Sequence, residues 1–139
     1  MILTKKTVFA IISFFILAIA LTALIISLNR FFGPVERQVL EVQFRVAEYP
    51  GFDGNRSGLF FGAIIPGGAG HRFLSFHNPY GYNLRLKVLP SSNIENFLII
   101  RPPEVFEPYG NYSIGATISV PRNASYSNYS GYVVFEFWK

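Results

Sequence analysis

The distribution of apolar residues divides the chain into two parts. No charged residue occurs between Thr7 and Leu28, and the apolar side chains in this stretch would point in every direction around a helix. At about 1.5 Å of rise per residue, such a helix is long enough to cross a hydrocarbon core of roughly 30 Å. The pattern therefore predicts a transmembrane helix over residues 7–28. Residues 1–6 would form a cytoplasmic tail and residues 29–36 a juxtamembrane linker, in which Pro34 stops the helix from continuing.

A cleavable signal peptide is the alternative interpretation of the same stretch. Lys5 and Lys6 would supply its positive start, and Ala18-Ile19-Ala20 has the small-x-small pattern of a cleavage site. That tripeptide lies in the middle of the apolar stretch, however, and the stretch is longer than the roughly 7–15 residues of a signal-peptide core. We therefore interpret the segment as an uncleaved signal-anchor.

After Arg37 the hydrophobic pattern changes to a period of two residues. Leu40, Val42, Phe44 and Val46 alternate with polar neighbours, which is typical of a strand with one buried face. Similar short segments recur, separated by turns rich in Gly, Pro and Asn. We predict strands over about 37–47, 59–65, 71–78, 82–89, 97–101, 112–120 and 131–138. Residues 37–139 should thus form an all-β, seven-stranded antiparallel immunoglobulin-like sandwich, and the lack of βαβ spacing argues against a parallel sheet.

Two segments resemble parts of prokaryotic immunoglobulin-like extracellular domains. Val120-Pro121 followed by Tyr129-Ser130-Gly131 is similar to their final hairpin, in which a Val-Pro turn leads to a Tyr-x-Gly entry into the closing strand. Arg72 to Pro79 is similar to their middle strand, which ends in an Asn-Pro turn. The layout of one N-terminal span and one sandwich also resembles archaellum stator subunits at the level of architecture. The resemblance implies a prokaryotic, and more specifically archaeal, cell-surface protein.

Composition and charge narrow the possible partners. The net charge is +4, and the basic residues are scattered rather than clustered, so no nucleic-acid footprint is predicted. The chain has no cysteine, which excludes disulfides and cysteine-ligated metal sites. Aromatic residues make up 17% of the chain, with 15 Phe and 8 Tyr. The aromatic content is therefore the most unusual feature of the composition.

Residues that could carry catalysis lack a supporting pattern. Asp53 could join a histidine and a serine in a hydrolase triad, but no nucleophile-elbow motif presents a serine. Glu104 and Glu107 could form a glycosidase pair, yet a Pro-bounded segment is typical of a solvated turn. His71 and His77 would lie roughly 20 Å apart on one strand, too far to share a metal ion. Gly67 to Gly70 lacks the Lys-Ser/Thr ending of a P-loop. We predict no enzyme activity, metal or cofactor.

Four sequons fit the N-glycosylation acceptor pattern, and they begin at Asn55, Asn111, Asn123 and Asn128. We place Asn55, Asn123 and Asn128 in loops and Asn111 at the start of a strand. Chance is the alternative explanation, because Asn and Ser are common turn residues. The basic residues flanking the span are nearly balanced, so the short N-terminal tail and the sequons decide the orientation. We predict a single-pass cell-membrane protein with its N-terminus inside and its C-terminal domain outside.

Tyrosines gather in the predicted loops among Asn, Ser and Gly, a composition typical of binding loops. The candidates are Tyr80, Tyr82, Tyr109, Tyr112, Tyr126 and Tyr129. The sequence favours a non-enzymatic, membrane-anchored extracellular domain that binds a surface protein or a cell-wall polymer. One alternative is a structural subunit of a larger membrane or filament assembly, held by its helix and by edge strands. Another is a carbohydrate-binding accessory module.

Overall fold

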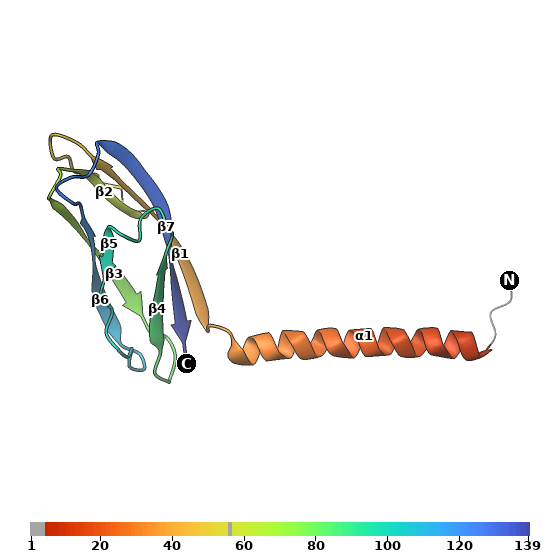
Figure 1. The fold of residues 1–139 in the computed structure, drawn as a ribbon. Coiled ribbons are helices and arrows are strands. Elements are labelled where there is room, and N and C mark those ends of the chain that lie inside the picture. Colours follow the sequence, from red (N-terminus) through yellow and green to blue (C-terminus); the bar gives the residue numbers. More distant parts are fainter. Residues whose placement is uncertain (1–4, 56) are drawn as a thin grey trace. The chain divides into compact units, whose positions relative to one another are not determined.

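The computed structural model describes residues 5–55 and 57–139 and divides the chain into two compact units, Met1–Gly33 and Pro34–Lys139. The first unit contains helix α1 and the second contains the strands (Figure 1). The boundary falls between Gly33 and Pro34, inside the predicted linker.

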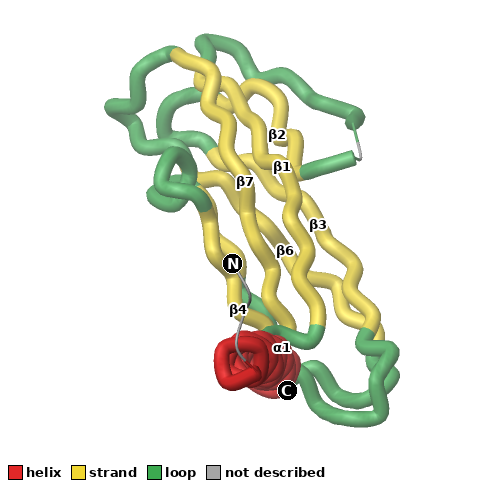
Figure 2. Tube along the Cα trace, turned by 90° about the vertical axis from the view of Figure 1, so that its right-hand side faces the viewer, coloured by secondary structure: helices red, strands yellow, loops and turns green. Residues whose placement is uncertain are grey.

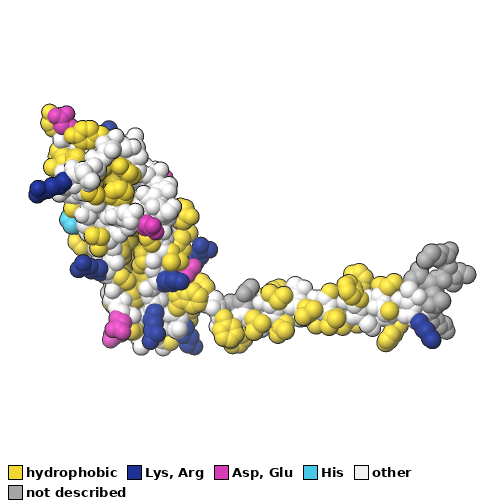
Figure 3. All heavy atoms as spheres, viewed as in Figure 1, with side chains coloured by type: hydrophobic (Ala, Val, Ile, Leu, Met, Phe, Trp, Pro, Cys, Tyr) yellow, Lys and Arg dark blue, Asp and Glu magenta, His cyan; other side chains and the backbone are white. Residues whose placement is uncertain are grey.

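Helix α1 spans Lys5–Phe32, so it continues past the predicted end at Leu28 and stops just before Gly33-Pro34. A residue that precedes proline is disfavoured in helical conformation, which explains why the helix ends here. The part from Lys6 to Leu28 is long and apolar enough to cross a membrane, and none of it is buried. Hydrophobic side chains cover the visible length of the helix (Figure 3). Their exposure fits a membrane anchor or a signal sequence.

The strands form two sheets that face each other as a β-sandwich (Figures 1 and 2). The larger sheet has the order β2-β1-β7-β4 and contains β1 (Glu36–Val46), β2 (Leu59–Ile64), β4 (Arg85–Pro90) and β7 (Ser127–Trp138). The smaller sheet has the order β3-β6-β5 and contains β3 (Ala69–His77), β5 (Leu98–Ile100) and β6 (Asn111–Ser119). The prediction of a predominantly β domain after one apolar helix is therefore confirmed.

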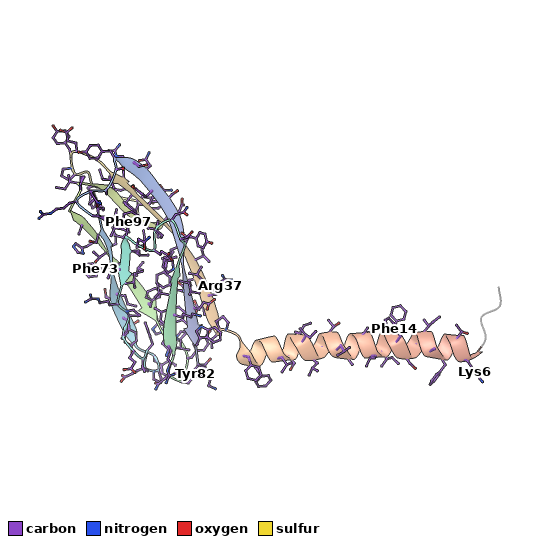
Figure 4. The ribbon with its side chains drawn as sticks, viewed as in Figure 1. Lys6, Phe14, Arg37, Phe73, Tyr82 and Phe97 are labelled. Atoms are coloured by element: carbon purple, nitrogen blue, oxygen red, sulfur yellow. The ribbon has the colours of Figure 1, made fainter. Side chains whose placement is uncertain are left out.

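The core lies between the sheets and is dominated by aromatic rings. On β1, Val42, Phe44 and Val46 are buried while their neighbours Gln43 and Arg45 are exposed, as the alternation predicts. The Phe76 ring lies at the centre, with its centroid 5.2 Å from that of Phe135, 5.5 Å from Phe137 and 6.5 Å from Phe106. Phe97 points into the space between the sheets (Figure 4). The high phenylalanine content thus fills a core that has no disulfide to support it.

The expectation of an entirely antiparallel sandwich is wrong at one pair, because β1 and β2 run parallel. Parallel neighbours need a long connection of about a dozen residues or more. Residues 47–58 make that connection, with no helix among the described ones (47–55 and 57–58), and they fold back so that Gly51 forms an antiparallel bridge with Ala63 of β2. The sequence shows these residues as a turn-rich loop, and that pattern does not distinguish a returning loop from a hairpin.

The second correction concerns β7, which begins at Ser127 rather than near Gly131. Asn128, predicted to lie in a loop, is therefore a strand residue opposite Arg45 of β1. Residues 127–130 are extended because β1 continues to Val46 and offers them a partner throughout. Polar composition alone suggested a turn here, but pairing with a long neighbouring strand overrides that local preference.

The sandwich has two ends that carry different loops. At the entry end the chain comes in at Val35, whose N–H donates to Phe137 O at 2.7 Å, and the loops 78–84 and 101–110 lie beside β7's last residues. At the far end β1 and β2 finish, and the connections 65–68 and 120–126 join the sheets.

Candidate functional site

The predicted tyrosine loops do not form one surface. Tyr80, Tyr82, Tyr109 and Tyr112 belong to the entry end, where β6 begins and β3 finishes. Tyr126 and Tyr129 belong to the far end, where β7 begins. Because β6 and β7 each run the length of the sandwich, the two groups are separated by that length (Figure 1).

At the entry end, the buried side chain of Asn78 ties two loops together. Its Nδ2 donates to the carbonyl oxygens of Tyr82 (2.9 Å), Glu107 (3.0 Å) and Phe106 (3.1 Å). Its Oδ1 accepts the N–H of Tyr80 at 3.0 Å. The network satisfies Tyr82 O and Tyr80 N–H, and it adds a second bond to Phe106 O and Glu107 O, which also accept backbone N–H groups. Asn78 is therefore a structural residue that fixes the positions of the neighbouring tyrosines.

Most of the tyrosines at the entry end pack against other side chains instead of projecting into solvent. The rings of Tyr80 and Tyr82 are stacked with centroids 5.2 Å apart, and the Lys139 ammonium lies 4.7 Å above the Tyr82 ring. Tyr112 packs on Phe106 at 4.5 Å, and its hydroxyl accepts the N–H of Glu107 at 2.6 Å. Tyr109 differs, because it is exposed and has a positive φ of 58°.

At the far end, Tyr129 is also part of the packing. Its ring is stacked on Phe44 with centroids 4.9 Å apart and touches Phe97 at 5.0 Å. Tyr126 remains exposed. Of the six predicted tyrosines, Tyr109 and Tyr126 are therefore the two that present most of their surface, and they lie at opposite ends.

A hollow of about 680 Å³ at the far end gathers polar side chains on the outer face of the larger sheet. Gln43 and Arg45 of β1 stand opposite Ser130 and Asn128 of β7 in the strand register. All four belong to the outward set of their strands, and Asp53 borders the same space. We call this site the polar hollow. Its lining comprises Gln43, Phe44, Arg45, Gly51, Phe52, Asp53, Gly54, Gly62, Ala63, Asn128, Tyr129 and Ser130.

The wall of the polar hollow is the returning segment 51–54, which is held at two points. Gly51 exchanges backbone hydrogen bonds with Ala63, at 2.9 Å and 2.8 Å. Arg72 of β3 donates from Nε to Phe60 O at 2.8 Å and from an Nη to Asp53 O, and its guanidinium carbon lies 5.2 Å from the Phe52 ring centre. These contacts keep the Phe52 ring at the surface, where it is 88% exposed.

A second, more apolar hollow of about 520 Å³ adjoins the first across the same segment. It is lined by Phe61, Ile64 and Ile65 together with the backbone of Gly68 and Gly70, and Phe52 borders both hollows. The combination provides the guanidinium groups of Arg45 and Arg72, one carboxylate, one imidazole, amide and hydroxyl groups and an exposed ring. Such a surface suits a polar ligand that also has an apolar face. Among the described residues, no group of three or more His, Asp or Glu is placed to hold a metal ion.

The sequons differ in their surroundings. Asn55 is exposed and closes a local turn, since its Oδ1 accepts both the N–H (3.0 Å) and the hydroxyl (2.9 Å) of Ser57, while Arg56 lies outside the described residues. Asn123 is exposed in a turn, as predicted. Asn111 is exposed at the start of β6, and its Oδ1 lies 2.9 Å from His77 Nδ1. Asn128 borders the polar hollow, so a glycan there would fill it.

The remaining candidates are placed apart from one another. His71 and His77 point outward from β3 and each pairs with β6, His71 through Thr117 Oγ1 at 2.9 Å. Gly67 has a φ of +80° in the turn between β2 and β3. Glu104 and Glu107 are exposed in the loop before β6. The tyrosine-rich composition of the loops did not predict the polar hollow. The signal for it was the polar alternation of β1, which marked Gln43 and Arg45 as outward residues.

Comparison of the chain with models of protein families, with curated proteins and with solved structures finds no match.

Proposed function

We propose that this chain is a single-span membrane protein whose β unit is a non-enzymatic, extracellular binding module with an immunoglobulin-like fold. In this proposal α1 stays in the bilayer with the N-terminus inside. The β unit engages a surface protein or a cell-wall polymer through the polar hollow. The resemblance of residues 72–79 and 120–135 to prokaryotic surface domains supports the fold assignment, and the exposed sequons fit the outward orientation.

The observation that carries the proposal is the chemistry of the polar hollow. Arg45 and Gln43 can donate hydrogen bonds, Asp53 can accept them, and Asn128 can do both. The Phe52 ring at the rim offers a flat apolar surface for a sugar ring or a side chain. Because the segment that carries Phe52 is pinned by Arg72 and Ala63, little conformational freedom would be lost when a ligand binds.

Substitution of Arg45 by Ala should weaken binding of the full chain to detergent-washed cell envelopes at least tenfold. The expectation follows from the loss of one charge-assisted hydrogen bond, which is about 1.5–3 kcal/mol. Arg85→Ala is the matched control, because Arg85 is also an exposed strand arginine of the larger sheet but lies at the entry end. Co-sedimentation measures the affinity. Equal binding by both variants would remove the polar hollow as the binding site.

The proposed topology predicts which single cysteines a membrane-impermeant maleimide labels in intact cells. Tyr126→Cys at the far end should be labelled, and Lys6→Cys should be labelled only after the cells are permeabilised. The chain has no cysteine of its own, so each label reports one position. Labelling of Lys6→Cys alone in intact cells would reverse the topology. A mature chain that has lost the Lys6→Cys site altogether would show cleavage.

A second candidate function is assembly through a sheet edge, in which the chain is a structural subunit of a larger membrane or filament complex. The favouring observation is β3, a nine-residue strand at the edge of the smaller sheet. The third candidate, a carbohydrate-binding accessory module, uses the same polar hollow. It would be supported if purified glycans competed with the envelope in the sedimentation assay.

A further inference from the structure

Strand β3 has a backbone edge that faces away from the smaller sheet. Asn78 N–H donates to Gly110 O and Val120 N–H donates to Gly68 O, both at 3.0 Å, so even-numbered positions bond to β6. In an antiparallel ladder the intervening residues direct their N–H and C=O groups to the other side. Phe73, Ser75 and His77 are such residues, and no backbone hydrogen bond from these groups occurs in the part of the chain that the structure describes.

Among the residues that the structure describes, contacts cover the first half of this edge. Near the far end, Arg72 reaches across to Phe60 O and Asp53 O, and Gly70 lies against Phe61 and Ile64. From Phe73 to His77 the outward side chains are exposed. This half contains no proline, no lysine and no bulge, the features that usually prevent edge strands from pairing with other chains.

Beside residues 73–77, the outer face of the smaller sheet carries a projecting ring and a hollow. The Phe73 side chain is 77% exposed and points away from the sandwich (Figure 4). A hollow of about 420 Å³ lies at the entry-end half of the same sheet and is lined by Ser75, Phe76, His77, Asn111, Tyr112 and Ser113. Phe73 and His77 are separated by about 13 Å, given a rise of about 3.3 Å per residue.

We propose that this edge pairs with the same edge of a second copy of the chain, antiparallel and centred on Ser75. The inference rests on the second candidate function, assembly through a sheet edge, and it does not depend on the polar hollow. With Ser75 opposite Ser75, each Phe73 stands opposite the His77 of the other copy. Each Phe73 ring then lies over the other copy's hollow, and the smaller sheets join into one continuous sheet.

A second copy fits better than an unrelated strand because the ring and the hollow are self-complementary. A two-fold axis at Ser75 places the ring of each copy over the hollow of the other, as a closed, isologous interface requires. Residues 73–77 contain no formally charged side chain, so like charges do not face each other across the pair. Arg72 lies outside these residues and is already engaged with the loop. Cross-strand aromatic pairs such as Phe73 with His77 stabilise a ladder.

Single-cysteine crosslinking of the full chain in detergent tests the register, with protein made in cells that do not attach glycans. In a hydrogen-bonded antiparallel pair the Cα atoms are about 5.5 Å apart, within the range a disulfide spans. Ser75→Cys should therefore form a disulfide-linked dimer on mild oxidation. Ser113→Cys is the matched control, because Ser113 is exposed beside Ser75 but would lie about 14 Å from its copy, three strand spacings away. We expect at least tenfold less dimer from this variant.

A mixture of two tagged variants tests whether Phe73 of one copy lies opposite His77 of the other. Phe73→Cys and His77→Cys chains should crosslink to each other, and each alone should crosslink poorly because equivalent positions would be about 13 Å apart.

Equal dimer from Ser75→Cys and Ser113→Cys, or no dimer from either, would overturn the proposal. Crosslinking of Ser75→Cys only to a different protein in native membranes would also overturn self-pairing, while the assembly function itself would stand. A glycan on Asn111 would block the hollow, so glycosylated protein should lose the Ser75→Cys dimer.

Discussion

Substitution of Asn78 by Ala should lower the free energy of unfolding of the β unit by about 2 kcal/mol or more, since each unsatisfied buried group costs about 1–3 kcal/mol. The side chain is 1% exposed, and its amide serves three carbonyl groups and one N–H. Truncation would leave Tyr82 O and Tyr80 N–H without this partner where water enters poorly, while Phe106 O and Glu107 O would keep the bonds from Leu84 N–H and Gly110 N–H. Denaturant unfolding followed by tryptophan fluorescence would measure the change, because Trp138 lies at the same end of the sandwich.

Two further variants separate the hydrogen bonds from side-chain volume. Asn78→Asp keeps the shape and the acceptor for Tyr80 N–H but directs a carboxylate at three carbonyl oxygens. It should destabilise at least as much as Ala at pH 7, and part of the loss should be recovered in acid, where the protonated carboxyl can donate. Asn83→Ala, at an exposed position in the same loop, should change stability by less than about 0.5 kcal/mol. Equal effects of Asn78→Ala and Asn83→Ala would contradict the structural role of Asn78.

Substitution of Gly62 by Ala should be about as damaging, with an expected loss of roughly 2–4 kcal/mol because a positive-φ site and a backbone clash coincide. Gly62 has a φ of 72°, and a Cβ there would come within 2.1 Å of Gly51 O. The residue lies where the parallel register of β1 and β2 shifts, beside the bridge between Gly51 and Ala63. Because that bridge forms the wall of the polar hollow, envelope binding should also weaken.

Gly115→Ala is the control for this prediction. Gly115 lies in β6 without a positive φ, and the nearest atom to an added Cβ is a Phe73 ring carbon at 3.9 Å. Its substitution should leave stability unchanged or slightly raised, since alanine restricts the unfolded chain more than glycine. Thermal unfolding of the two variants under the same conditions gives the comparison. A Gly62→Ala variant as stable as Gly115→Ala would show that the loop can move away from β2.

The sequence alone was sufficient for features that depend on local periodicity. The uninterrupted apolar stretch predicted the helix, because no other common structure accommodates apolar side chains on every face over that length. The period of two between Leu40 and Val46 predicted both the strand and its buried side, and the structure confirms this. On β7, Val133, Phe135 and Phe137 also lie two residues apart, and all three are buried. In each case the side-chain pattern reflects one neighbouring environment along one element.

Only the tertiary structure decided which segments meet. The parallel pairing of β1 with β2, the extension of β7 to Ser127 and the hydrogen bonds from Asn78 to Phe106 O and Glu107 O each join residues that lie far apart in sequence. Local composition reports a preference for turn or strand, but not the partner that satisfies a backbone group. For the same reason the tyrosines, similar in sequence context, divided into packed and exposed sets. The polar hollow emerged where outward residues of two paired strands meet a returning loop.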